Sequence, residues 1–109
     1  MALVRLCATA EVPEDSVKAI EIGDKTLAVY NIAGSFYATD DECTHGVASL
    51  AMGMLDGDQI ECSVHFGCFH VPSGKAVAPP CEIDLRTYKV VAEGDDLYVD
   101  LEQTADAAN

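Results

Sequence analysis

Basic residues are scarce in this chain of 109 residues: six lysines and arginines stand against 19 aspartates and glutamates, which gives a formal net charge of −13. Phosphate backbones and anionic lipid headgroups would repel such a protein, so the sequence argues against nucleic-acid and membrane partners. The charge favours either simple solubility or a protein partner with a basic surface.

Long apolar runs are also absent. No segment approaches the roughly 18 apolar residues that a membrane-spanning helix needs. The first residues, MALVRLCATAEVPEDS, lack the uncharged stretch of a signal peptide and reach an acidic side chain at Glu11. We therefore expect a cytoplasmic protein, in which five cysteines, an odd number, favour free thiols or metal ligands over disulfides.

Short strands with tight turns are predicted along most of the chain, and no long segment has helical periodicity. Segments 18–22 and 26–32 flank a turn at Gly23, and segment 35–39 follows a turn at Gly34. This pattern predicts an antiparallel meander in an all-β chain.

A second predicted hairpin lies near the other end of the chain, where segments 85–91 and 96–102 flank the turn AEGD. Apolar Leu97, Val99 and Leu101 recur at every second position of the later segment. The residues that alternate with them are Tyr98, Asp100 and Glu102. This alternation predicts one buried and one exposed face.

The region from about 41 to 80 is rich in glycine, cysteine and histidine and poor in regular pattern. It holds five of the eight glycines: Gly46, Gly53, Gly57, Gly67 and Gly74. A segment with so many glycines would not hold one conformation by itself. We therefore expect a bound metal centre to fix its conformation. By length the chain is a single domain, 1–109, with a polar tail at 102–109.

Candidate metal ligands occur in two pairs. Cys43 and His45 form a Cys-x-His motif, 16 residues follow, and Cys62 and His65 form a Cys-x-x-His motif. A zinc finger usually takes its cysteines from one turn and its histidines from another, whereas here each loop supplies one of each. Mixed pairs favour a two-iron centre in which thiolates hold one iron and imidazoles the other, with sulfide as the bridge. A zinc site with the same four ligands remains the alternative.

A further Cys-x-His pair, Cys68 and His70, competes with the second loop. We prefer the earlier pair, because residues that follow a ligand loop usually enter a strand, where a free cysteine packs as a small hydrophobe. His70 is then expected to be a structural histidine with its hydrogen bonds satisfied. Cys7 and Cys81 are also expected to be structural.

The motifs CTHG and CSVH, together with PSGK and APPCE, resemble the Rieske [2Fe-2S] family, and the likeness spans essentially the whole chain. The resemblance implies an all-β, antiparallel β-sandwich with a cluster-binding subdomain inserted at about 41–80. It also implies one [2Fe-2S] cluster, whose buried iron is held by Cys43 and Cys62. The outer iron would be held by His45 and His65.

The resemblance also indicates which residues surround the cluster. The pair Pro79-Pro80 resembles a proline-containing loop that covers one side of it, and small glycines let backbone N–H groups approach the sulfurs. The expected neighbours of the cluster are Gly46, Val47, Val64, Gly67 and Pro80.

Two departures from the high-potential members of the family affect the expected potential. Those members carry a disulfide across the two loops at the positions that hold Ala48 and Val64 here. They also carry a serine and a tyrosine, which donate hydrogen bonds toward cluster sulfurs, where this chain has Gly67 and Phe69. Hydrogen-bond donors stabilise the more negative reduced cluster, so their absence lowers the reduction potential. We therefore expect a potential of about −150 mV, the low end of the Rieske range.

An electron carrier is the function that the resemblance implies. The sequence shows no catalytic triad, nucleotide-binding glycine motif or mononuclear iron site. Terminal Rieske oxygenases carry a large catalytic domain after this one, and with the last residue at Asn109 we do not expect one here. It is most similar to the ferredoxin components of multicomponent aromatic-ring dioxygenases, which are not themselves enzymes. We expect a monomer that takes electrons from a flavin-containing NAD(P)H reductase and passes them to a terminal oxygenase. His45 and His65 would lie at the exposed tip, with Val47 and Phe66 in the docking surface.

Two alternatives remain open from the sequence. A Rieske-like small subunit of a nitrite reductase would share the fold, and a zinc-stabilised interaction module would lack redox activity. The aromatic substrate is not specified by this chain, because the oxygenase selects it.

Overall fold

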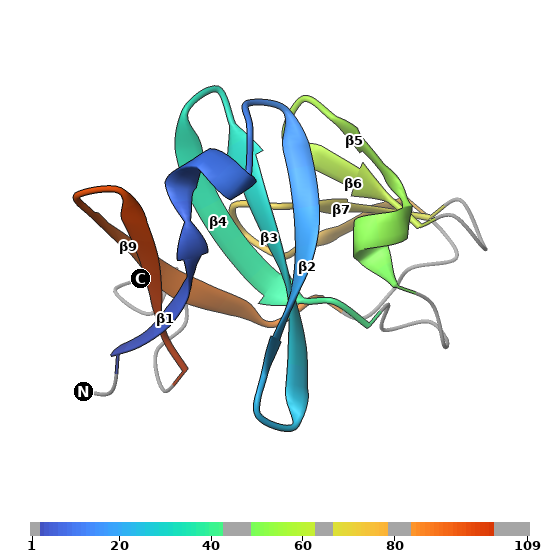
Figure 1. The fold of residues 1–109 in the computed structure, drawn as a ribbon. Helices are drawn as coiled ribbons and strands as arrows, with labels where there is room; N and C mark the ends of the chain where they lie inside the picture. Colours follow the sequence, from blue (N-terminus) through green and yellow to red (C-terminus); the bar gives the residue numbers. More distant parts are fainter. Residues whose placement is uncertain (1–2, 43–48, 63–66, 79–83, 102–109) are drawn as a thin grey trace.

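The computed structural model describes residues 3–42, 49–62, 67–78 and 84–101. These parts of the chain form ten strands and two 3₁₀ helices, η1 and η2 (Figure 1). In chain order the elements are β1 (Leu3–Ala8), η1 (Thr9–Glu11), β2 (Ser16–Ile22), β3 (Lys25–Ile32), β4 (Ser35–Asp40), η2 (Leu50–Met52), β5 (Met54–Asp56), β6 (Gln59–Glu61), β7 (Cys68–His70), β8 (Ala76–Ala78), β9 (Thr87–Glu93) and β10 (Asp96–Asp100).

The larger sheet has six strands in the order β1, β10, β9, β4, β3, β2, and every neighbouring pair is antiparallel. Its three predicted turns are confirmed. Gly23, Gly34 and Gly94 all have positive φ (58°, 91° and 61°), the left-handed conformation that tight hairpins require and that glycine adopts without strain. The all-β, antiparallel prediction is therefore correct, although β1 was not predicted.

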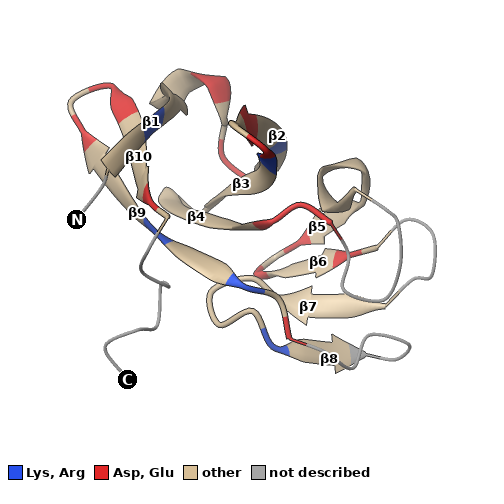
Figure 2. Cartoon of the chain, turned by 90° about the horizontal axis from the view of Figure 1, so that it is seen from below, with Lys and Arg blue, Asp and Glu red and all other residues tan. Residues whose placement is uncertain are grey.

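The smaller sheet has four antiparallel strands in the order β5, β6, β7, β8, each of only three residues. In the sequence it lies between β4 and β9, in the region that has little regular pattern. Figures 1 and 2 show it beside the larger sheet. Strands this short gain little stability from their own hydrogen bonds, so packing against the larger sheet must hold them.

Strand β3 belongs to two hydrophobic cores. Leu27 and Val29 face the core of the larger sheet, whereas Ala28 and Tyr30 face the core between this sheet and the smaller one. All four are fully buried. A strand covered on both faces reads as a continuous apolar run, which is the pattern of this segment. Strand β3 therefore couples the two sheets mechanically.

The hairpin of β9 and β10 has the predicted buried face, with Leu97 and Val99 fully enclosed. Asp100 differs from the prediction, since it is only 3% exposed. It pairs with Lys89 on β9 and with Leu3 on β1, so neighbouring strands cover it on both sides. Within the described parts of the chain, no helix has the length and apolar character needed to cross a membrane.

Candidate metal centre

One edge of the smaller sheet, formed by strand ends, leads into the second predicted ligand loop and into the segment with the two prolines. Glu61 on β6 pairs with Met54 on β5 and with Cys68 on β7, and Cys68 pairs in turn with Ala78 on β8. This row is the edge at which β6 runs on into Cys62, β7 begins and β8 ends. The chain therefore enters segments 63–66 and 79–83, which lie outside the described residues, from the same edge.

The ends of the first predicted ligand loop are tied together by backbone pairing. Glu42 and Ser49 form an isolated antiparallel bridge. Next to this bridge, the N–H of Leu50 donates to the carbonyl of Asp41 at 2.7 Å, and the N–H of Ala51 donates to Oδ1 of Asp41 at 2.9 Å. Asp41 is only 7% exposed, so the bond from Ala51 satisfies one oxygen of a carboxylate that has little contact with water. This residue fixes the return of the chain into η2.

The second predicted loop is closed in a similar way, because the N–H of Cys62 donates to the carbonyl of Gly67 at 2.8 Å. The side chain of Cys62 is fully buried and packs in the same core as Leu50. A thiol enclosed at a sheet edge, at the start of a short closed loop, fits a ligand to a metal shielded from water. The return of the first loop and the start of the second are thus held in one core.

Gly53 brings η2 and β5 into direct backbone contact with β6. A Cβ atom at this position would lie 2.0 Å from the carbonyl oxygen of Glu61 and 3.2 Å from that of Leu50. Only glycine allows this approach. Since Glu61 directly precedes Cys62, Gly53 sets the distance between the two chain segments that lead to the predicted ligands.

The segment that contains Pro79 and Pro80 is anchored at the far end of β8. Asp84 accepts a hydrogen bond from the N–H of Ala76 at 2.9 Å, and the N–H of Leu85 donates to the carbonyl of Gly74 at 2.7 Å. Gly74 has a φ of 78°, and a Cβ there would lie 2.4 Å from the carbonyl oxygen of Leu85. The two ends of segment 79–83 therefore lie at opposite ends of β8.

Most of the predicted site lies outside the described residues. Cys62 and Gly67 are described, and both are buried at the sheet edge. The other named positions lie outside the described parts: Cys43, His45, Gly46, Val47, Ala48, Val64, His65, Phe66, Pro80 and Cys81. Within the described parts, no group of three or more metal-ligating side chains is placed to hold an ion.

His70 is the structural histidine that the sequence predicts. Its Nδ1 lies 2.7 Å from Oγ of Ser73, and its Nε2 lies 3.1 Å from Oδ2 of Asp58. Both ring nitrogens therefore have protein partners, one in the turn after β7 and the other in the turn between β5 and β6. Cys7 is structural as well, because it is buried in the core of the larger sheet.

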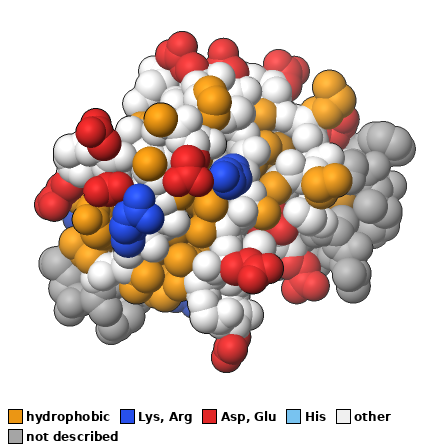
Figure 3. Space-filling model, viewed as in Figure 1, with side chains coloured by type: hydrophobic (Ala, Val, Ile, Leu, Met, Phe, Trp, Pro, Cys, Tyr) orange, Lys and Arg blue, Asp and Glu red, His pale blue; other side chains and the backbone are white. Residues whose placement is uncertain are grey.

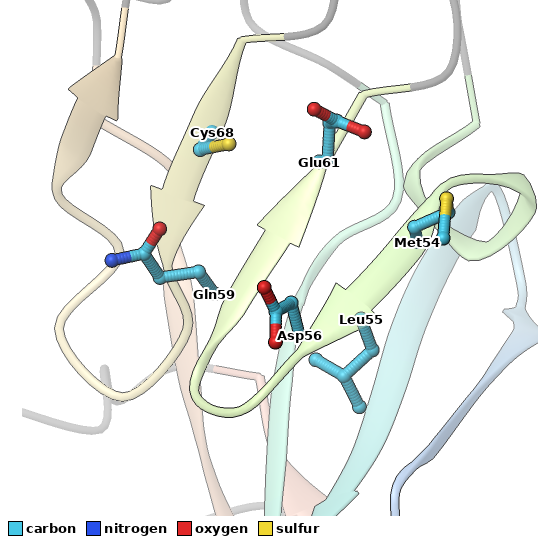
Figure 4. A pocket seen from close by; sticks show the side chains of 6 residues that line it. All are labelled: Met54, Leu55, Asp56, Gln59, Glu61 and Cys68. Carbon is cyan, nitrogen blue, oxygen red and sulfur yellow. The ribbon is translucent and has the colours of Figure 1, made fainter.

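Cys68 opens strand β7, as predicted, but it does not face the core. Inward-facing Phe69 is fully buried, whereas Cys68 lies half-buried on the outer face beside Glu61 (Figure 4). Burial first, and then the charges of Glu61 and Asp56, raise the pKa of the Cys68 thiol.

Sequence reasoning missed two residues that position the site. Asp41 appears in the sequence as one more acidic residue in an acidic chain, and Gly53 as one of several turn glycines. Their roles depend on contacts between separate segments, namely with η2 and with β6. The only local signal for Asp41 is its place two residues before Cys43.

Comparison with known proteins gives consistent matches. The family model of the Rieske [2Fe-2S] domain matches residues 2–89. The ferredoxin component of the p-cumate 2,3-dioxygenase system of Pseudomonas putida is 46% identical over 101 residues, which cover 91% of this chain and 86% of that protein. The ferredoxin component of the biphenyl 2,3-dioxygenase of Rhodococcus jostii is 40% identical, over 94% of this chain and 95% of that protein.

Solved structures agree with these relatives. The ferredoxin of Sphingomonas yanoikuyae B1 superposes with a TM-score of 0.87 at 40% identity, over 91% of this chain and 98% of that one. A chain in the complex of reduced oxygenase and oxidized ferredoxin of carbazole 1,9a-dioxygenase gives 0.84 at 39% identity, over 89% of this chain and 91% of that one. A nitrite reductase small subunit gives 0.78 at 17% identity, over 92% of this chain and 99% of that one, a likeness that shows the fold alone.

Proposed function

This chain belongs to the Rieske [2Fe-2S] family, and we propose that it is the ferredoxin of a multicomponent aromatic-ring dioxygenase system. The observation that carries the proposal is the likeness to ferredoxin components of such systems, which reaches 46% identity over 91% of this chain. The cofactor is a Rieske-type [2Fe-2S] cluster. The protein is an electron-transfer component and not an enzyme in its own right.

Cys43 and Cys62 are the proposed ligands of the buried iron, and His45 and His65 those of the outer iron. The bound cluster supplies one-electron exchange. Support for the assignment comes from Cys62, which is fully buried at the edge where the second loop begins. The remaining proposed neighbours of the cluster are Gly46, Val47, Val64, Gly67 and Pro80.

A pair of serine variants tests the second ligand loop. Cys62→Ser should abolish the visible absorption and the Rieske-type EPR signal of the reduced protein. Cys68→Ser, which replaces an outer-face thiol of similar size, should keep both. If Cys68→Ser loses the signal and Cys62→Ser keeps it, the second ligand loop lies further along the chain.

The proposed partners are a flavin-containing NAD(P)H reductase and a terminal oxygenase. A net charge of −13 favours brief encounters with basic partner surfaces, because opposite charges accelerate association without a large interface. Val47 and Phe66 are the proposed apolar contacts at the tip that the two histidines form. We further propose that the protein works in the cytoplasm as a monomer.

Reconstitution tests this function directly. The assay combines NADH, the reductase of the p-cumate or biphenyl system, this protein and the terminal oxygenase of the same system. The protein should carry electrons from the reductase to the oxygenase. Oxygenase reduction should stop when this protein is left out. The control is the Cys62→Ser variant, which should not support transfer. A colourless protein that contains one zinc ion and no labile sulfide would instead support the interaction module.

A further inference from the structure

The outer face of the smaller sheet carries side chains that do not belong to either core. Met54 and Asp56 of β5 point to this face, as do Gln59 and Glu61 of β6 and Cys68 of β7 (Figure 4). Together with Leu55 they line a shallow pocket of about 260 Å³. The alternate residues of the same strands pack inward against β3. The pocket is therefore a surface feature of the sheet and not a defect in its core.

Exposed apolar side chains are concentrated around this sheet. Four large hydrophobic side chains are exposed in the described parts of the chain, and three of them, Met52, Met54 and Val77, belong to the small sheet or to η2. Met52 and Met54 are 76% and 69% exposed and flank Gly53. Methionines exposed to water add nothing to the stability of the fold. Their flexible, polarisable side chains suit a surface that binds another protein.

The pocket also carries uncompensated negative charge. Asp56 and Glu61 line it, and among the described residues no lysine, arginine or histidine lies within ion-pair distance of either carboxylate. Figure 3 shows acidic side chains scattered over the visible face, with few basic ones among them. A partner that docks at Asp56 and Glu61 is therefore expected to bring positive charge. A lysine or arginine fits such a pocket, because its apolar stem contacts Met54 and Leu55 while its charged end meets the carboxylates.

The place of this face in the fold connects it with electron transfer. Glu61 lies in the pocket and directly precedes Cys62, and Cys68 begins the strand that follows the second ligand loop. A protein bound on this face would contact the edge from which the second proposed ligand loop leaves.

We propose that the outer face formed by Met54, Asp56 and Glu61 is a docking surface for a redox partner that inserts a lysine or arginine between the carboxylates. The proposal rests on the proposed function, since it names the surface that an electron carrier would use. It differs from the tip contacts at Val47 and Phe66, because it lies on the sheet itself.

Charge reversal tests the surface, with a matched control elsewhere on the molecule. Asp56→Lys should lower the second-order rate of oxygenase reduction about tenfold. Asp24→Lys makes the same change of net charge on an exposed turn between β2 and β3 and should lower it only about twofold. Stopped-flow rates would be measured over a range of salt concentrations, with the absorption spectrum and the reduction potential unchanged in both variants.

A second pair tests the apolar part. Met54→Ser should slow transfer while leaving its salt dependence intact, and Leu3→Ser, at an exposed apolar site on β1, should have no effect. The acceptors would be the terminal oxygenases of the p-cumate and biphenyl systems and, separately, cytochrome c as a basic one-electron acceptor. If an oxygenase is reduced but each variant matches its control, the docking surface is wrong and the proposed function stands. If neither oxygenase is reduced while the cytochrome c rates depend on Asp56 and Met54, the surface stands and the proposed function fails.

Discussion

The two sheets of this protein are stabilised in different ways. The larger sheet has strands of five to eight residues, three hairpin turns with positive-φ glycines and its own hydrophobic core. The smaller sheet has strands of three residues, and its core is shared with β3 of its neighbour. The larger sheet is therefore stabilised by local hairpins and by its own core, whereas the smaller one depends on contacts between segments that are distant in the sequence.

This difference separates the part that stabilises the protein from the part that positions the proposed site. The second proposed ligand loop leaves from the smaller sheet, and the first one follows β4 and returns into η2. Contacts of β3, Gly53 and Asp41 position these elements. Damage to the larger core should destabilise the whole chain. Substitutions that weaken the contacts of the smaller sheet should release the cluster before the whole chain unfolds.

The largest expected effect is the loss of a buried aromatic ring. Phe69→Ala leaves a cavity in the core between β3 and the smaller sheet and should lower the free energy of unfolding by about 3 to 5 kcal/mol. Leu97→Ala empties the core of the larger sheet and should cost about 2 to 5 kcal/mol. Only Phe69→Ala should release the cluster at urea concentrations below the global transition.

Urea titrations of the cluster-loaded variants, followed in parallel by visible absorbance and far-ultraviolet circular dichroism, measure this separation. In the Leu97→Ala variant the two signals should change together. If the cluster is released early in both variants, or in neither, the two cores act as one and the comparison of the sheets fails.

A smaller effect is expected from a single methyl group at Gly53. Gly53→Ala places a Cβ against the carbonyl oxygen of Glu61, so β5 and η2 must move away from β6, at a cost of about 2 to 3 kcal/mol. Gly57→Ala is the matched control in the same sheet. Gly57 has a φ of 61° but open space around it, so only backbone strain of about 1 kcal/mol is expected.

The measurement for this pair is the rate of cluster loss to a chelator at neutral pH. Gly53→Ala should lose the cluster faster than the unmodified protein, and Gly57→Ala at an unchanged rate. Equal rates in the two variants would show that the close approach of η2 to β6 does not position the ligand loops.

The same contrast explains what the sequence could predict. The hairpins of the larger sheet are local, since each has alternating residues on both sides of a turn glycine, and they were predicted with errors of a few residues. The family was identifiable from the spacing of cysteines and histidines, because metal ligation constrains spacing directly. Three-residue strands such as β7 carry too few residues for an alternating pattern, so the smaller sheet was not predicted.

Contacts between segments account for the remaining differences. The sequence predicted that Cys68 enters a strand, but not that it faces outward, because a shift of one residue exchanges the two faces. The burial of Asp100 depends on its neighbours in β1 and β9, which the pattern of β10 alone does not contain. The closure of the first loop by Asp41 likewise depends on η2, 10 residues later in the chain.

The smallest expected effect concerns this closure. Asp41→Ala leaves the N–H of Ala51 without its carboxylate acceptor and should cost about 1 to 2 kcal/mol of unfolding free energy. Asp41→Asn keeps a side-chain oxygen for that N–H and should cost less, but it removes a negative charge beside the first ligand loop. Removing this charge favours the more negative reduced cluster, so Asp41→Asn should raise the reduction potential while the rate of cluster loss to a chelator stays unchanged. Asp41→Ala should raise both the reduction potential and the rate of cluster loss to the chelator. If Asp41→Asn releases the cluster as fast as Asp41→Ala, the charge of Asp41, and not its hydrogen bond to η2, holds the first loop in place.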